Sequence, residues 1–181
     1  RVVLLGANGT GKSQLVRMIN AAFSGDESPV KHATSVIAAY SDQDLSQLEA
    51  YTTPMQSLTR QFDIGDHRCR AVLAGAGIRK HMQDGSIDAL SGGQRARLAM
   101  LILRLKKPNF YLLDEPTNHL DIDGQEALEE ELVHHGAACL LVSHDRSFMG
   151  NVGNRFWWIK GRKLEEVDSP EAFLRDQAGA S

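Results

Sequence analysis

The chain has 181 residues, of which 42% are hydrophobic and 24% charged, and its formal net charge is −3. This length and composition are typical of one globular domain that buries its own core. The small negative charge excludes a general electrostatic attraction to nucleic acid, so any such contact requires a local patch or segments outside the chain. The longest apolar runs, such as Ala137–Val142, fall far short of the ~20 residues that cross a bilayer, so we expect no membrane insertion by this chain.

The two cysteines give no sign of a disulfide framework or a zinc site. Cys69 and Cys139 lie far apart in the sequence, and neither belongs to a CxxC pair. We therefore expect reduced cysteines and a cytoplasmic location.

The first third of the chain predicts two strands and a helix. Val2–Leu5 is a short apolar run that ends in glycines, which favours a buried parallel strand. Apolar residues at helical spacing after Lys12 predict a helix whose N-terminus faces the glycine-rich loop. Gly25–Lys31 is polar and contains proline, so it predicts a loop, and Val36–Tyr40 predicts a second strand.

The middle of the chain predicts a helical arm, a long helix and a strand. From Thr53 to about Asp88 the pattern is helical, weakly amphipathic and interrupted by glycines. Ser91–Leu105 has one apolar stripe along an otherwise polar helix, and it begins at a glycine pair. Tyr111–Leu113 is a strand that ends at an Asp-Glu pair, and open α/β sheets bind their ligands at this edge.

The last third predicts a helix, a strand, a β-hairpin and a short final helix. In chain order these are Gln125–His134, Ala138–Val142, the pair Phe156–Ile159 and Lys163–Val167 around Lys160–Arg162, and a helix that opens at Ser169–Glu171. The alternation of strands and helices is typical of an α/β fold with a mostly parallel sheet.

The sequence GANGTGKS at Gly6–Ser13 fits the phosphate-loop pattern between a strand and a helix. Its glycines let the backbone wrap a triphosphate, Lys12 can neutralise the β- and γ-phosphates, and the Ser13 hydroxyl can bind Mg²⁺. The alternative is a glycine-rich turn with an exposed lysine. The predicted nucleotide-binding residues are Gly6, Asn8, Gly9, Thr10, Gly11, Lys12, Ser13 and Gln14.

A pair of carboxylates follows the buried strand that ends at Leu113. Asp114 occupies the position from which a carboxylate holds Mg²⁺ through its water shell. Glu115, one residue later, can orient an attacking water. An acidic pair at a strand end is ordinarily solvated, but the apolar residues before it and Pro116 after it argue for a buried site.

Together with the phosphate loop, LSGGQ at Leu90–Gln94 and YLLDEPTNHLD at Tyr111–Asp121 resemble the ATP-binding cassette (ABC) ATPases. The resemblance covers nearly the whole chain and implies a P-loop NTPase-type, mostly parallel sheet flanked by helices. It also implies one nucleotide-binding domain over residues 1–181, a helical arm at about 44–90, and a C-terminal β-hairpin with a helix. The adenine-stacking aromatic of this family lies on earlier strands, so we expect that the sequence is truncated at its N-terminus.

The resemblance assigns catalytic roles to three residues. Glu115 is the general base or water-polarising carboxylate, Gln43 matches the glutamine that touches Mg²⁺ or the water, and His144 matches the histidine that contacts the γ-phosphate. Without the family, Gln43 is more readily interpreted as a surface residue and His144 as a structural or exposed histidine. The implied cofactors are ATP and Mg²⁺, and the implied ligands of Mg²⁺ are Ser13, Gln43 and Asp114.

The motif LSGGQ is implied to act on a second cassette. Ser91, Gly92, Gly93 and Gln94 put free N–H groups and a hydroxyl at a helix N-terminus, which is an anion site. Because the motif is too far from the phosphate loop to serve the same ATP, we expect it to complete the site of a partner in a head-to-tail pair. The partner is a second cassette of the same polypeptide or a second copy of the chain. For LSGGQ alone, a helix cap is the alternative interpretation.

Two segments resemble the ABC-F group in particular: DEPTNHLD at Asp114–Asp121 and SHDR at Ser143–Arg146. Members of that group are soluble proteins with two cassettes that act on the ribosome. The resemblance therefore implies a role in translation, with ribosome contacts made by segments outside this chain. The alternative is the nucleotide-binding subunit of an ABC membrane transporter. A third, non-enzymatic interpretation is a regulatory cassette that uses ATP only to hold two domains together.

Overall fold

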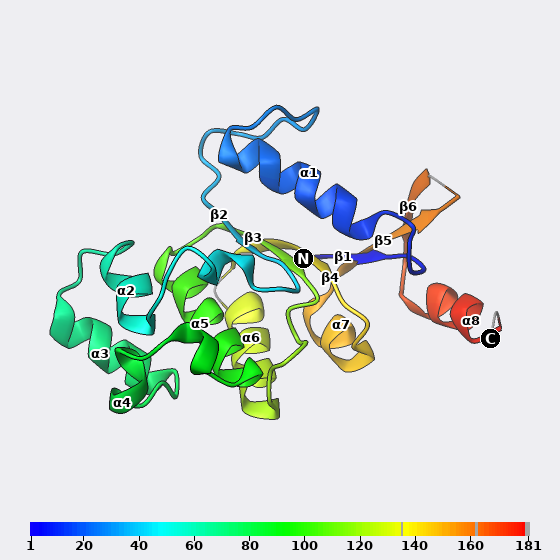
Figure 1. Ribbon diagram of the computed structural model, residues 1–181. Coiled ribbons are helices and arrows are strands. Elements are labelled where there is room, and N and C mark those ends of the chain that lie inside the picture. Colours follow the sequence, from blue (N-terminus) through cyan, green and yellow to red (C-terminus); the bar gives the residue numbers. More distant parts are fainter. Residues whose placement is uncertain (135, 162, 180–181) are drawn as a thin grey trace.

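The computed structural model describes residues 1–134, 136–161 and 163–179, and within these residues six strands form one sheet (Figure 1). In the order of the sheet they are β2 (Ala38–Ser41), β3 (Phe110–Asp114), β4 (Ala138–Val142), β1 (Val2–Leu5), β5 (Arg155–Lys160) and β6 (Lys163–Val167). Neighbouring strands pair in parallel except β5 and β6, which form an antiparallel hairpin. The carboxyl ends of β1, β2, β3 and β4 therefore meet at one edge of the sheet.

Helices cover both faces of the sheet (Figure 1). α1 (Lys12–Ser24) lies on one face, and α5 (Gly92–Leu105), α6 (Ile122–His134) and α7 (Arg146–Val152) lie on the other. α8 (Glu171–Gly179) follows the hairpin at the C-terminal end of the described chain. None of the described helices is long and apolar enough to cross a lipid bilayer.

The side chains of the strands build two cores, one on each face of the sheet. Leu4 and Leu112 pack with Val16 of α1. Leu5 and Leu113, the next residues of the same strands, pack with buried residues of α5, α6 and α7. Because successive residues of a strand point to opposite faces and both faces are covered, these strands are apolar throughout.

Residues 44–90 form a group of short helices with a core of its own. In chain order the elements are the 3-10 turn Ser46–Leu48, α2 (Pro54–Thr59), α3 (Asp66–Gly75), α4 (Lys80–Gln83) and the 3-10 turn Ile87–Ala89. Leu58 and Leu73 are fully buried in this group and pack in one cluster with Leu98 and Ile102 of α5. The helix that carries LSGGQ is therefore shared between the arm and the sheet.

The predicted α/β fold with a mostly parallel sheet is confirmed, and its strands occur in the predicted chain order. The predicted strand Val36–Tyr40 begins too early, because β2 starts at Ala38. Asn109 gives the reason: its Oδ1 accepts a hydrogen bond from the N–H of Ile37 at 2.8 Å, and its Nδ2 donates to the carbonyl of Ser35 at 2.9 Å. These side-chain bonds satisfy backbone groups that strand pairing would otherwise satisfy. In the predicted hairpin turn, Arg162 lies outside the described residues.

The helix α7 has no counterpart in the sequence-based prediction. It is only seven residues long and contains Gly150, so local propensity gives little signal for it. The Asp145 carboxylate caps it by accepting a hydrogen bond from the N–H of Phe148 at 3.0 Å. Phe148 and Met149 are both buried in the core of that face. Tertiary packing therefore stabilises a helix that would not form alone.

The end of α7 yields a prediction about stability. A Cβ atom on Gly153 would lie 2.5 Å from Cγ2 of Val3, 2.7 Å from the carbonyl oxygen of Met149 and 2.9 Å from a ring carbon of Phe156. We expect Gly153→Ala to lower the free energy of unfolding by about 1–3 kcal/mol, the usual cost of overpacking a core. Chemical denaturation followed by tryptophan fluorescence measures the change.

The matched control is Gly150→Ala in the preceding turn of the same helix. A Cβ atom at Gly150 meets nothing within 4 Å. Alanine should therefore leave stability unchanged or raise it by about 0.5–1 kcal/mol, because it favours the helix. Equal effects of the two substitutions would contradict the close packing around Gly153.

Candidate functional site

A cavity of about 660 Å³ opens at the carboxyl edge of the sheet. Its walls come from the ends of β3 and β4 and from the segments that follow β1, β2, β3 and β4. The lining residues are Asn8, Gly9, Gly11, Lys12, Ser13, Gln14, Gln43, Asp114, Glu115, Asn118, Val142 and His144. A polar cavity at this edge is where open parallel sheets bind their ligands.

Most of the residues predicted from the phosphate loop and the strand ends line this cavity, but Gly6 and Thr10 do not. Gly6 lies under the loop, where a Cβ atom would come within 2.6 Å of the Thr10 hydroxyl oxygen. Asn118 and Val142 line the cavity and were not predicted. Asn118 belongs to the DEPTNHLD segment, so its position in the motif was an available signal, whereas Val142 gave no signal beyond its strand.

Hydrogen bonds within the phosphate loop set its shape. The Lys12 ammonium donates to the carbonyls of Gly6 at 2.7 Å and Ala7 at 3.2 Å, so the side chain folds back across the loop. Gly9 and Gly11 have φ values of 78° and 98°, in the left-handed region that glycine adopts without strain. The first turn of α1 lines the cavity, and its unpaired N–H groups and positive dipole end favour an anion there.

The charge of Lys12 is only partly compensated within the chain. Burial lowers the pKa of the Lys12 ammonium below its usual value, while the carboxylates of Glu115 and Asp114 act in the opposite direction. A phosphate bound in the cavity would supply further negative charge and favour the charged lysine. The electrostatics of the loop therefore suit an anionic ligand.

Glu115 is held in an uncommon backbone conformation at the end of β3. Its φ is 51°, and its N–H donates to the carbonyl of Val142 at 2.9 Å. Its Oε2 accepts a hydrogen bond from the backbone N–H of His144 at 3.2 Å. Its Oε1 lies 3.3 Å from Nε2 of His144, but the two atoms are not aligned for a hydrogen bond.

The Oε1 atom of Glu115 is thus a buried acceptor without a hydrogen-bond partner among the described residues. Burial raises the pKa of Glu115, while the charge and the N–H of His144 act to lower it. A carboxylate with a raised pKa is a stronger base than an exposed glutamate. Because Glu115 also lines the cavity, its carboxylate can act as a base toward a molecule bound there.

Three oxygen-bearing side chains on the cavity wall fit a small hard cation. Ser13, Gln43 and Asp114 line the same cavity and offer a hydroxyl, an amide and a carboxylate, the ligand types that Mg²⁺ binds. Among the described residues, no group of three or more His, Cys, Asp or Glu side chains could hold a metal ion. A cation here would therefore take most of its ligands from water and from a bound phosphate, as Mg²⁺ commonly does.

LSGGQ begins α5 with a capping box. The Ser91 hydroxyl accepts a hydrogen bond from the N–H of Gln94 at 3.2 Å, and the Gln94 side-chain oxygen accepts one from the N–H of Ser91 at 2.9 Å. Among the described residues that line the cavity, none belongs to this motif. Within one chain, LSGGQ therefore caps a helix and lies apart from the phosphate-loop cavity.

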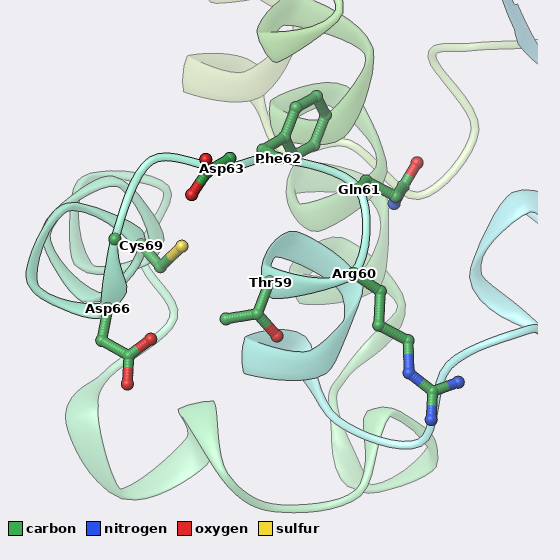
Figure 2. Close-up of a pocket in the computed structure, with 8 residues that line it drawn as sticks. Thr59, Arg60, Gln61, Phe62, Asp63, Asp66 and Cys69 are labelled. Carbon is green, nitrogen blue, oxygen red and sulfur yellow. The ribbon is translucent and has the colours of Figure 1, made fainter.

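A second hollow, of about 450 Å³, lies in the arm (Figure 2). Its lining residues are Thr59, Arg60, Gln61, Phe62, Asp63, Gly65, Asp66 and Cys69. Burial raises the pKa of the Cys69 thiol, so the sulfur is not a thiolate nucleophile at neutral pH. None of the residues predicted for nucleotide binding or catalysis lines this hollow.

Known ABC proteins are similar in sequence to most of this chain. A sequence model of the ABC transporter family matches residues 1–118. The ATP-binding cassette sub-family F member 3 of Mus musculus is 33% identical over 187 residues, which cover 98% of this chain and 26% of that protein. The "Probable ATP-binding protein YheS" of Escherichia coli (strain K12) is 34% identical over 174 residues, which cover 93% of this chain and 27% of that protein. The chain thus spans about a quarter of the length of these relatives.

Two solved structures share the fold. A dimeric ATP-binding cassette in a post-hydrolysis state, bound to ADP and Pi, has a TM-score of 0.69 and 18% identity and covers 92% of this chain and 84% of that chain. RNase-L Inhibitor has a TM-score of 0.69 and 24% identity and covers 98% of this chain and 36% of that chain. With the sequence relatives, these similarities confirm the resemblance to ABC ATPases and to the ABC-F group.

The buried carboxylate of Glu115 leads to a prediction about stability and pH. Because the pKa of Glu115 is raised in the folded chain, its ionisation opposes folding at high pH and costs nothing at low pH, where both states are protonated. We expect Glu115→Gln to stabilise the nucleotide-free chain on the order of 1 kcal/mol at about pH 8. The gain should vanish toward about pH 4. Denaturation curves at the two pH values measure it.

The matched control is Glu126→Gln, which removes an exposed carboxylate of α6. It should change the free energy of unfolding only slightly, and by the same amount at both pH values. A loss of stability in Glu115→Gln at the higher pH would mean that His144 stabilises the carboxylate more than burial destabilises it.

Proposed function

The chain belongs to the ATP-binding cassette family, and on that premise we propose that it hydrolyses Mg²⁺-bound ATP to ADP and phosphate in a head-to-tail pair of cassettes. One observation carries the proposal: Glu115 lines the same cavity as the phosphate loop, and its buried Oε1 has no hydrogen-bond partner among the described residues. A carboxylate in this position can take a proton from a water that attacks the γ-phosphate. A site that only binds nucleotide gains nothing from a buried base.

Different residues of this chain have different roles in the proposed reaction. Lys12 and the N–H groups of the phosphate loop bind and orient the triphosphate. Asp114 and Ser13, with Gln43, would hold Mg²⁺, which would neutralise charge on the phosphate oxygens. Glu115 orients the water and takes its proton.

His144 completes the arrangement on the side of Glu115. Its backbone N–H holds Oε2 of Glu115, and its ring lies beside Oε1 and on the cavity wall. It therefore keeps the carboxylate in place and can donate a hydrogen bond to the γ-phosphate. The position of the ring beside Glu115, in a residue that lines the cavity, favours this role over that of an isolated surface histidine.

The partner in the pair contributes LSGGQ. Ser91, Gly92, Gly93 and Gln94 lie at the N-terminus of α5, away from this chain's own cavity, so they close over the ATP of the second cassette. The dimeric cassette bound to ADP and Pi, whose fold this chain shares, supports the pairing. The second cassette is another part of the same polypeptide or a second copy.

The protein that contains this chain is, in the same proposal, a cytoplasmic ABC-F protein that acts on the ribosome. The similarity to sub-family F member 3 over nearly the whole chain supports this group. With a net charge of −3, the chain attracts RNA only weakly, so ribosome contacts belong mainly to segments outside it. The family description as ABC transporter keeps a transporter subunit as the second candidate.

Two substitutions separate phosphate binding from hydrolysis. Lys12→Ala should weaken ATP binding about 10- to 100-fold, because it removes a charged donor to the phosphates. Glu115→Gln should keep ATP affinity but lower turnover about 10²- to 10⁴-fold, because it removes only the base. Calorimetric titration and a phosphate-release assay measure the two effects. Turnover of Glu115→Gln at the parental rate would exclude the proposed role of Glu115.

The ribosome assignment is tested in the full-length protein that contains this chain. With Glu115→Gln holding the ATP-bound form, it should co-sediment with ribosomes in ATP and dissociate in ADP. The association should fall steeply with salt, because charged segments make the contacts. Co-purification with an integral membrane subunit, without nucleotide-dependent ribosome binding, would favour the transporter and leave the ATPase proposal intact.

A further inference from the structure

Two arginines of α5 bind carboxylates at the two ends of α6. Nη1 of Arg97 lies 2.5 Å from Oδ2 of Asp121, directly before α6, and Nε of Arg104 lies 3.0 Å from Oε2 of Glu131 near its end. The arginines are two helical turns apart and therefore lie on one side of α5. Together these ion pairs fix α5 alongside α6.

Arg97 is more enclosed than an ordinary surface arginine. Its side chain is 32% exposed, and its Nε is buried with no hydrogen-bond partner among the described residues. The guanidinium packs against Gly77, in the turn after α3, where a Cβ atom would lie 3.4 Å from Nε. Gly77 has a φ of 80°, in the left-handed region that favours glycine. The arm therefore contributes to the pocket that holds this side chain.

The partner of Arg97 also organises the segment 117–121. Oδ1 of Asp121 accepts a hydrogen bond from the N–H of Gly124 at 3.1 Å and so caps α6. In the same segment, the carbonyl oxygen of His119 lies 3.2 Å from where a Cβ atom on Gly93 would stand. The segment 117–121 therefore touches LSGGQ at Gly93 and is bound to the same helix through Arg97.

The ion pair between Arg104 and Glu131 is connected to β3, the strand that ends at Asp114. Oε1 of Glu131 accepts a hydrogen bond from the hydroxyl of Tyr111 at 2.8 Å. Tyr111 is buried in β3, three residues before Asp114, and burial raises its pKa, so the hydroxyl remains a donor. Arg104, Glu131 and Tyr111 thus connect the end of α5 to β3.

We propose that Arg97 is a positioning residue that makes LSGGQ and the segment 117–121 move as one unit when two cassettes close on ATP. The inference rests on the proposed pairing, in which LSGGQ meets the partner's nucleotide. A planar guanidinium held between Asp121 and Gly77 fixes the spacing of the two segments more rigidly than apolar packing alone.

The first test measures amide hydrogen exchange in the nucleotide-free chain and is independent of pairing. Arg97→Met removes the ion pair, and Asp121→Asn removes its charge while an amide oxygen still caps Gly124. Both should speed exchange of the hydrogen-bonded amides of residues 94–95 and 124–125 about tenfold and leave the strands unchanged, because only the local structure opens.

Arg155→Met is the matched control, because it breaks an exposed ion pair with Glu166 in the β5–β6 hairpin, far along the chain from α5. It should leave exchange of the amides of residues 94–95 and 124–125 unchanged. Unchanged exchange in both Arg97→Met and Asp121→Asn overturns the proposal. An equal rise throughout the sheet also overturns it, because that result marks a general loss of stability.

The second test measures ATP-driven pairing by sedimentation in chains that also carry Glu115→Gln. Arg97→Met should weaken pairing about tenfold without changing the ATP affinity of the single chain, and Arg97→Lys should restore only part of the loss, because an ammonium keeps the charge but not the planar guanidinium. Parental pairing in Arg97→Met overturns the proposed coupling. Failure of the Glu115→Gln chain itself to pair counts against the proposed function, and the exchange result then still decides whether Arg97 joins the two segments.

Discussion

The parallel pairing of β4 with both β1 and β3 is the constraint on which the site depends. Asp114 lies beside Val142 in the β3–β4 register, and the N–H of Glu115 extends the contact to the Val142 carbonyl at 2.9 Å. The segments that follow these three strands therefore leave the sheet at one edge. A slip of one residue would turn the side chains of Leu113 and Asp114 each to the other face, which would disturb the packing on both faces and separate the carboxylates from the phosphate loop.

The parts of the fold and site that the sequence predicted are those with a local signal. Apolar runs located the strands, and glycines beside Lys12 located the phosphate loop before any contact was known. The start of β2 depends on the side chain of Asn109, which is distant in sequence, and α7 depends on burial of Phe148. Neither the hydrogen bonds of Asn109 nor the burial of Phe148 can be recognised from the hydrophobic periodicity of the sequence. The contact of LSGGQ with His119 likewise exists only after α5 and the end of β3 meet in space.

Glu115 combines several features that each oppose folding. It has a positive φ, its carboxylate is buried, and one of its oxygens has no hydrogen-bond partner among the described residues. Its neighbour across the cavity, Lys12, is a buried cation whose pKa is also displaced by burial. Several features that normally destabilise a folded chain therefore occur together at this edge of the sheet, whereas the surrounding strands are apolar and well packed. Such a concentration marks a site arranged for a ligand, since a triphosphate and a water supply the partners that the chain does not.

The helix α5 shares apolar cores with the arm and with α6, and charged bonds join it to α6 as well. Leu98 and Ile102 join the apolar core of the arm, and dispersion and burial there depend little on direction. Arg97 and Arg104 bind α6 through directed, charged bonds that lose strength when the geometry changes. A rotation of α5 relative to α6 therefore costs directed bonds as well as apolar contact. The ion pair of Arg97 and the contact of His119 with Gly93 thus make the spacing between LSGGQ and the segment 117–121 depend on the geometry of both helices.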